Sequence, residues 1–451
     1  MKRGQNNVLV GIMAILFCIS AVACQSSPEK VHEPSSTSSQ PTTAGTDQHT
    51  QNQTATSETA GSIPLTSTSS KTVSFTTAGH ATSDIESRTT TSHTLSTTSA
   101  SNPTTWKNTV YSFANPDILS QYNIQGRSAL IKNQGISFDW SANTLEFRAY
   151  CKGKVSLSMY VDSRLAESGY KNVYFSLYVD GVKQERLAAA VTTNDHTRVE
   201  ITLADKLSAG QHRFKLVRQT ESYLALVTLN ELRLTGYLSQ PPAKSSLYIE
   251  FIGDSVTVGL GNLCTNGEVQ PESDYPVNQD ATQSWAYFTA DALCADYSVL
   301  ARTGIGVFNG WDSNNKSMAD MYPYVSYYRD KTTLWEFKRA PDLIIVNLGT
   351  NDMMRGSNTE TLKMQMKSFL QQIRKKNPHA KILWVAGGML SSYWSMAQSA
   401  VDDLGGKNNN YYCCRLTAGL NGGGNGHPSA AQQKQLASEL FKYLQQNNLV
   451  P

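Results

Sequence analysis

The sequence predicts two folded domains in tandem, an all-β domain followed by an α/β domain with a mostly parallel sheet. Three observations support this prediction. In residues 25–105 about half of the positions are Ser or Thr with no apolar period, so this segment cannot form a core. Residues 106–243 contain short runs of alternating apolar residues, as half-buried strands do. In residues 244–451 apolar strands alternate with segments of helical period, which is typical of a parallel sheet.

Charge and apolar content exclude two functional classes. The chain of 451 residues has 39 Lys and Arg against 36 Asp and Glu, a formal net charge of +3. No block of basic residues is dense enough to follow a phosphate backbone, so we expect no nucleic-acid partner. A multi-pass membrane protein is excluded because the sequence has a single long apolar run.

That apolar run lies at the N-terminus and predicts export. Lys2 and Arg3 precede an apolar stretch at residues 8–23, which is short for a spanning helix and typical of a secretory signal. The stretch ends in Ala21-Val-Ala-Cys24, which resembles a bacterial lipobox, although Ala21 replaces the usual Leu. We expect residues 1–24 to be a lipoprotein signal peptide, with a plain signal peptide as the alternative. Lipid-modified Cys24 would be the membrane anchor of an extracellular, cell-surface lipoprotein, and residues 25–105 its disordered linker.

The elements of the first domain are predicted to be strands. Residues 155–161 and 173–179 have every second position apolar, and Asp180-Gly181 then gives a hairpin signal. Further strand patterns follow at 199–203, 214–217 and 224–234. Many strands without a convincing helix indicate a β-sandwich or jelly roll, and Pro241-Pro242 indicates a linker within 237–245.

The elements of the second domain alternate in type. Strands are predicted at 247–252, 297–301, 342–348 and 381–386, and helices at 283–295, 359–376 and 429–446. The 359–376 helix has one apolar face, formed by Leu362, Met366, Phe369, Leu370 and Ile373. Ser429 with Gln432 predicts a capping box for the last helix. In such sheets, sites form at the carboxyl ends of the strands.

Three chemically capable residues lie at such ends. Ser255 directly follows a buried strand within Gly253-Asp254-Ser255, where a nucleophile would be presented at the rim of the sheet. Asn351 follows the strand at 342–348, and its amide can donate to a developing oxyanion. His427 precedes the last helix and is a candidate general base. Each motif alone also fits an ordinary turn, cap or surface histidine.

In the order Gly253-Asp254-Ser255, Gly304, Asn351 and His427, these residues resemble the four blocks of the SGNH (GDSL-like) hydrolases. The β-rich first unit, residues 249–255, residues 347–352 and the Gly426-His-Pro-Ser429 ending resemble carbohydrate esterase family 2. Members of that family join a jelly-roll domain to a three-layer α/β/α SGNH domain and remove acetyl groups from plant polysaccharides. The resemblance covers residues 106–451 and implies domains at 106–243 and 244–451.

The resemblance also implies catalytic roles. Ser255 would attack the ester carbonyl, and His427 would take its proton and return it to the departing sugar hydroxyl. The Ser255 and Gly304 N–H groups and the Asn351 side chain would form the oxyanion hole, with no metal or cofactor. Asp254 and Asp352 would have structural roles and hold their loops in place by hydrogen bonds. SGNH enzymes often have an Asp three residues before the catalytic histidine, but this sequence has Gly424 at that position. We therefore expect a Ser–His dyad, in which a backbone carbonyl accepts a hydrogen bond from the other ring nitrogen of His427.

The expected substrate is an acetylated plant cell-wall polysaccharide, either xylan or glucomannan. Two alternatives stay open: an esterase on bacterial envelope glycans or small acyl esters, and a mainly carbohydrate-binding protein of the same fold. Aromatic residues that could stack on sugars are Trp311, Trp335, Trp394 and the tyrosines of 322–328. The cysteines after the leader are five, an odd number without zinc-site spacing, so we expect mostly free thiols.

Overall fold

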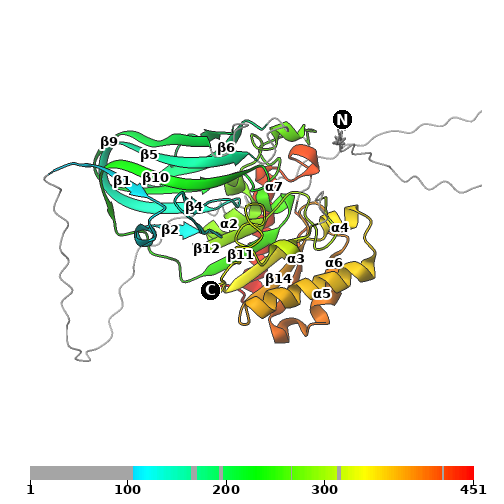
Figure 1. The fold of residues 1–451 in the computed structure, drawn as a ribbon. Helices are drawn as coiled ribbons and strands as arrows, with labels where there is room; N and C mark the ends of the chain where they lie inside the picture. Colours follow the sequence, from blue (N-terminus) through cyan, green and yellow to red (C-terminus); the bar gives the residue numbers. More distant parts are fainter. Residues whose placement is uncertain (1–104, 164–169, 192–196, 266, 312–315, 419–420) are drawn as a thin grey trace, which may run out of the picture. The chain divides into compact units, whose positions relative to one another are not determined.

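The computed structural model describes residues 105–163, 170–191, 197–265, 267–311, 316–418 and 421–451, all within one compact unit of the chain (Figure 1). The predicted leader, Cys24 and nearly all of the Ser/Thr-rich segment lie outside these residues. None of the helices in the described ranges is long and apolar enough to cross a bilayer.

The first domain is an antiparallel sheet that contains ten strands within the described residues. Its centre is formed by three long neighbours, β10 (Ala225–Ser239), β5 (Thr144–Ser163) and β9 (Thr197–Arg218), whose pairings contain bulges that bend the sheet. This confirms the all-β prediction, with the strands joined in one continuous sheet. The shorter strands are β1 (Asn108–Ser112), β2 (Asn123–Gln125), β3 (Leu130–Ile131), β4 (Gly135–Ser137), β6 (Asn172–Val179), β7 (Val182–Lys183) and β8 (Leu187–Ala190).

The predicted alternation sets which face of this sheet is buried. In β5, Val155, Leu157, Met159 and Val161 all face the core of the domain. The Asp180-Gly181 turn joins β6 to β7 with φ of +52° and +83°, the left-handed pair that a type I′ hairpin needs. The sheet extends into the expected linker, because β10 ends only at Ser239.

The second domain is a parallel sheet of five described strands in the order β12–β11–β13–β14–β15. Its strands are β11 (Tyr248–Gly253), β12 (Asp296–Ala301), β13 (Leu343–Asn347), β14 (Lys381–Ala386) and β15 (Tyr411–Arg415). One apolar cluster joins the sheet to α2 (Trp285–Ala292) and α7 (Ala430–Gln446), and a second joins its other face to α5 (Thr359–Lys376) and α6 (Trp394–Asp402). The three-layer α/β/α prediction is therefore confirmed (Figure 1).

Several predicted bounds hold and one is wrong. The helix at 359–376 and the strand at 381–386 have the predicted ends, and Ser429 and Gln432 form the capping box of α7. The helix predicted at 283–295 spans only 285–292, because Cys294 takes the left-handed φ of +48°. Short helical turns complete the domain: α1 (Ser255–Val258), α3 (Met318–Met321) and α4 (Thr350–Met354).

The strand order creates a switch point at β11. The chain passes from β11 to β12 on one side and then returns to β13 on the other, so the loops after β11 and β13 diverge. Ligand sites in open parallel sheets form at such points.

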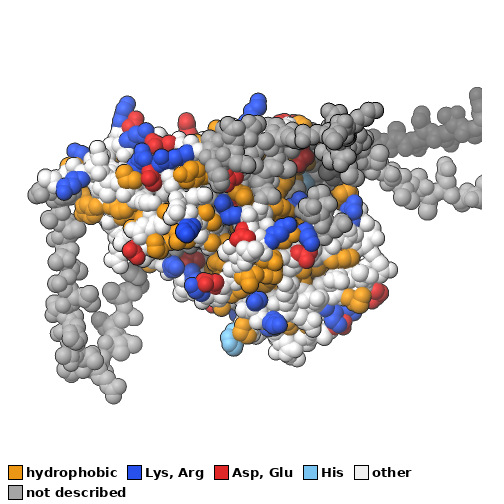
Figure 2. Space-filling view, viewed as in Figure 1, with side chains coloured by type: hydrophobic (Ala, Val, Ile, Leu, Met, Phe, Trp, Pro, Cys, Tyr) orange, Lys and Arg blue, Asp and Glu red, His pale blue; other side chains and the backbone are white. Residues whose placement is uncertain are grey.

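On the face drawn in Figure 2, basic and acidic side chains are interspersed.

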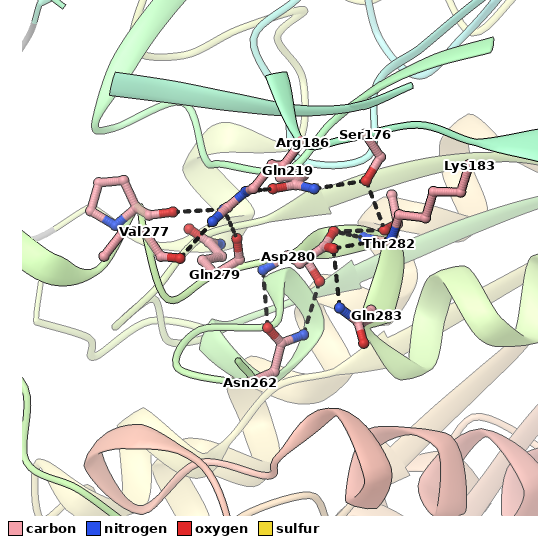
Figure 3. Close-up of polar contacts among 11 residues, drawn as sticks. Ser176, Lys183, Arg186, Gln219, Asn262, Val277, Gln279, Asp280, Thr282 and Gln283 are labelled. Atoms are coloured by element: carbon pink, nitrogen blue, oxygen red, sulfur yellow. Dashed lines mark hydrogen bonds and ion pairs between the residues drawn. The ribbon is translucent and has the colours of Figure 1, made fainter. Parts of the chain in front are cut away.

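A polar network joins the two domains (Figure 3). The Arg186 guanidinium, from the β domain, donates to the backbone carbonyls of Pro276, Val277 and Gln279. In the same network the Ser176 hydroxyl lies 3.1 Å from that of Thr282. Arg186 thus holds the loop at residues 276–279 of the second domain in place.

This loop also reaches the start of the last helix. The Asp280 N–H donates to Asn262 Oδ1 (3.0 Å), and Asn262 Nδ2 donates back to the Asp280 carbonyl (2.9 Å). The Asn262 carbonyl in turn accepts from the N–H of Ala430, the first residue of α7. Hydrogen bonds therefore connect the β domain to the segment that carries His427.

Candidate active site

Ser255 is the first residue of α1, directly after β11. Asp254 caps this single turn by accepting the Val256 N–H at 3.1 Å. Gly253 is required before it, because a Cβ there would lie 2.0 Å from Thr257 Oγ1. This tight turn presents the Ser255 side chain at the carboxyl edge of the sheet, where the residue is 5% exposed.

His427 lies against Ser255 through its ring. Its Nε2 is 2.8 Å from Ser255 Oγ, and its Nδ1 lies 3.1 Å and 3.0 Å from the carbonyl oxygens of Gly424 and Asn425. A carbonyl can only accept, so Nδ1 carries the proton and Nε2 is left as an acceptor for the serine hydroxyl. Burial lowers the pKa of His427 to about 4, against the opposing effect of the two carbonyls. The imidazole is therefore neutral at pH 7 and able to take a proton.

In the loop before His427, a side chain at 424 would require Gln270 to move. A Cβ on Gly424 would lie 1.6 Å from Gln270 Nε2, so the Gln270 side chain fills the space of a side chain at 424. Asn425 holds the loop in place: its Oδ1 accepts the Gln270 N–H at 2.7 Å, and its own N–H donates to the Glu268 carbonyl. Two backbone carbonyls therefore orient His427, where the sequence predicts a backbone carbonyl in place of a carboxylate.

Gly304 lies in the loop after β12 with a left-handed φ of +76°. A Cβ there would meet the Trp311 side chain at 3.3 Å, and the Gly304 carbonyl accepts the Trp311 N–H at 2.7 Å. Neither the Gly304 N–H nor the Ser255 N–H donates to another residue of the described ranges. Both N–H groups are thus available to a ligand.

Asn351 lies in α4, after β13, and is 6% exposed. Its amide donates to the Ile305 carbonyl at 2.9 Å and to Asp254 Oδ2 at 3.3 Å, which links the loops of Gly304 and Ser255. Its neighbour Asp352 accepts the N–H groups of residues 307–309 at 2.9–3.0 Å. Burial raises the pKa of Asp254 to about 7 and also raises that of Asp352.

The aromatic candidates divide by position. Trp311 lies next to Gly304 and is 38% exposed, with the Arg355 guanidinium 4.7 Å from its ring centroid. Tyr322 is fully buried, and with Trp335 it surrounds the Arg127 guanidinium. Trp394 packs against the core beneath α6. Of these candidates, Trp311 adjoins a predicted site residue.

Two neighbours of the site were not predicted. The glycines of 422–426 signal that another group fills their side-chain space, but nothing in the sequence identifies Gln270 as that group. Glu221 of the β domain contacts Thr303, the residue before Gly304. The sequence carries no signal for it, because its partner lies in the other domain.

Other chemistry was also sought in the described residues. No group of three or more His, Cys, Asp or Glu side chains in these ranges is arranged to hold a metal ion. The five cysteines after the leader, Cys151, Cys264, Cys294, Cys413 and Cys414, are free thiols.

Comparison with known proteins extends this picture. The model of the GDSL-like Lipase/Acylhydrolase family matches residues 251–440, and the Carbohydrate esterase 2 N-terminal model matches residues 124–242. The cellulase/esterase CelE of Acetivibrio thermocellus is 30% identical over 281 residues, which cover 61% of this chain and 32% of that protein. The chain thus matches about a third of the length of CelE. An acetylxylan esterase / glucomannan deacetylase of Cellvibrio japonicus is 28% identical over 351 residues, covering 70% of this chain and 87% of that protein.

Solved structures show the same fold. A family two carbohydrate esterase from Clostridium thermocellum, solved in complex with cellohexaose, has a TM-score of 0.63 and 26% identity, covering 72% of this chain and 99% of that one. An acetyl xylan esterase from the rumen bacterium Butyrivibrio proteoclasticus has a TM-score of 0.65 at 21% identity, with 75% and 99% covered. Both family models match in the order of the two domains seen here. The chain thus combines a GDSL-like (SGNH) hydrolase domain with the N-terminal domain of carbohydrate esterase family 2.

Proposed function

We propose that the protein removes O-acetyl groups from plant cell-wall polysaccharides, xylan or glucomannan, through a Ser255–His427 dyad and an acyl-enzyme intermediate. The observation that carries the proposal is the 2.8 Å contact between Ser255 Oγ and His427 Nε2, with Nδ1 bound to carbonyls. The substrate class is supported by the Cellvibrio relative, which is named for acetylxylan and glucomannan deacetylation.

The first step forms the acyl-enzyme. Ser255 Oγ attacks the acetyl carbonyl carbon while its proton passes to His427 Nε2. The resulting oxyanion accepts hydrogen bonds from the N–H groups of Ser255 and Gly304 and from the Asn351 amide. The amide hydrogen that makes the long 3.3 Å contact with Asp254 is the one that turns to the oxyanion. Each such donor contributes roughly 10²–10³ in turnover.

Collapse of the oxyanion intermediate completes this first step, and hydrolysis of the acyl-enzyme is the second. The imidazolium of His427 returns its proton to the sugar oxygen as the C–O bond breaks, leaving acetyl-Ser255. Water then attacks the acetyl carbon while His427 takes its proton, and His427 returns that proton to Ser255 Oγ as the acyl C–O bond breaks and acetate leaves. The carbonyls of Gly424 and Asn425 keep the ring aligned through both steps.

We further propose that the enzyme acts at a bacterial cell surface, anchored by lipid on Cys24 with residues 25–105 as its tether. The support is the Ala21-Val-Ala-Cys24 pattern after an apolar leader. Incorporation of labelled palmitate into the wild-type protein, and none into Cys24→Ala, is the expected result. Labelling of both variants would contradict an anchor at Cys24.

The proposed activity is tested by acetate release from acetylated xylan and acetylated glucomannan. We expect release by the wild-type protein and a loss of at least ~10³-fold in Ser255→Ala and in His427→Ala. Exposed residues of the same types supply matched controls, Ser273→Ala and His379→Ala, which should keep wild-type rates.

Other outcomes identify the alternatives. Binding of both polymers without acetate release would indicate a carbohydrate-binding protein. If the protein neither binds the two polymers nor releases acetate from them, but hydrolyses small acyl esters, its substrate is another ester. Retained activity in Ser255→Ala would reject the dyad itself.

A further inference from the structure

The loop between β9 and β10 carries a buried carboxylate from the β domain to the catalytic loop after β12. Glu221 is 0% exposed, and it accepts twice from Thr303. Its Oε2 accepts the Thr303 N–H at 2.7 Å, and its Oε1 accepts the Thr303 hydroxyl at 2.6 Å. Thr303 is followed directly by Gly304, whose N–H is a predicted oxyanion donor.

The Glu221 backbone is itself fixed. Arg218, also 0% exposed, donates to the carbonyls of Glu221 and Thr220 within the loop, each at 2.9 Å. It also donates to the Phe138 carbonyl of the β domain at 2.8 Å. Glu221 therefore reaches Thr303 from a rigid base in the first domain.

The position of Thr303 decides where the Gly304 N–H points. That N–H belongs to the peptide between the two residues, and glycine places little restriction of its own on the orientation of this peptide. Farther along the loop, Asn351 and Asp352 already hold residues 305–309. At the start of the loop, the Arg302 N–H makes a long 3.3 Å bond to the Gly253 carbonyl. The two hydrogen bonds from Thr303 to Glu221, at 2.7 Å and 2.6 Å, are shorter than this bond of Arg302 at the start of the loop.

A second contact ties Glu221 to the nucleophile side. Gln279 Nε2 lies 3.5 Å from Glu221 Oε1 and donates to the Val258 carbonyl of α1 at 3.1 Å. Glu221 thus stands between the turn of Ser255 and the loop of Gly304. Both of its oxygens are used within the protein, so it acts through Thr303 and does not touch substrate.

We propose that Glu221 is a positioning residue of the esterase, which fixes Thr303 and so aims the Gly304 N–H at the oxyanion. The inference rests on the proposed esterase function, and it assigns the β domain a part in building the active site.

Kinetics on p-nitrophenyl acetate and on acetylated xylan test the proposal. In Glu221→Ala we expect kcat to fall about 10- to 100-fold with KM changed less than about 2-fold, because a misplaced donor weakens the transition state and not the bound ester. Thr303→Val removes the hydroxyl bond from the other side and should lower kcat about 3- to 10-fold, whereas Thr303→Ser restores it. In the double variant Glu221→Ala with Thr303→Val, the fall in kcat should be smaller than the product of the two single falls, because both changes break the same contact.

Tyr297→Phe is the matched control, because it removes a buried hydrogen bond at the same domain interface, to Thr144 of β5, at the opposite end of β12 from the Gly304 loop. We expect its kcat and KM to equal those of the wild type. Wild-type kcat in both Glu221→Ala and Thr303→Val, or equal losses in Tyr297→Phe, would overturn the positioning role.

A readout independent of esterase activity separates the two proposals. Backbone amide hydrogen exchange of a peptide covering residues 302–309 should be faster in Glu221→Ala and unchanged in Tyr297→Phe. Unchanged exchange in Glu221→Ala would overturn the inference even if the wild type is an active esterase. Inactive wild-type protein with the expected exchange result would reject the proposed function and leave the Glu221–Thr303 coupling established.

Discussion

At the scale of single residues, His427, the proposed base, is oriented without a carboxylate. Two carbonyl oxygens fix the tautomer, which an acid would otherwise do, but they bring no full negative charge to stabilise the imidazolium. Burial then dominates and lowers the pKa to about 4. His427 is therefore a neutral hydrogen-bond acceptor over most of the pH range. The same burial makes its protonated form less stable than that of an exposed histidine.

This environment predicts the acid limb of the pH profile. A general base works only when neutral, and His427 is neutral above its pKa, so kcat/KM should rise with pH and be half-maximal near 4. The measurement is kcat/KM for a soluble acetyl ester across the acid range, with folding followed in parallel. A midpoint near the ordinary histidine value of about 6.5 would show that burial does not control this group.

At the scale of elements, the loop at 421–427 shows why the acid is absent. Gln270, which also pairs with Asn425 across 155 residues of the chain, occupies the side-chain space of Gly424. The loop is therefore shaped by a neighbour and holds His427 through its backbone.

An exchange of these two side chains tests that explanation. Gly424→Asp alone should displace the loop and lower kcat about 10- to 100-fold, because its Cβ would overlap Gln270. Adding Gln270→Ala makes room, so the double variant should recover activity. Its carboxylate near the ring should also raise the pKa of His427 and move the acid limb to higher pH. Gln270→Ala alone is the control, and a double variant no better than Gly424→Asp would contradict this account.

The elements predicted well from sequence are those with a strong apolar period and clear caps. The helix at 359–376 is one, with all five predicted face residues buried. Neither β15 nor α6 was predicted from the sequence. β15 is an edge strand reading Tyr-Tyr-Cys-Cys-Arg without Val or Ile, and its burial depends on contacts with α6 and β14. Motifs at strand ends identified Ser255 and His427 as candidates. Gln270 and Glu221 act across 155 and 82 residues of sequence, and local patterns carry no information on such pairs.

At the scale of the whole molecule, the two domains share buried charges. Arg127 of the β domain pairs with Glu250 of β11 at 3.0 Å, with side chains 0% and 3% exposed. The same guanidinium donates to the carbonyls of Tyr322 and Tyr324. We therefore expect the domains to unfold in one cooperative transition, since separating them would leave a charge unpaired in an apolar surface.

Breaking that pair tests the coupling. Arg127→Met should lower the free energy of unfolding by about 3–5 kcal/mol, because Glu250 would stay buried without its partner. Arg127→Met with Glu250→Met removes both charges and should recover much of the loss. Denaturant unfolding followed by tryptophan fluorescence measures both. Two separate transitions in the wild type, or a negligible effect of Arg127→Met, would mean that the domains are independent.

The contact between Ser255 and His427 joins residues 172 positions apart. A ribosome adding ~5–20 residues per second completes the nucleophile roughly ten to thirty seconds before the base exists. During that interval the nascent chain carries a serine with nothing to remove its proton. The proposed dyad therefore forms only after residue 427 has been synthesised and has packed against Ser255, so its activity would report that translation has passed residue 427.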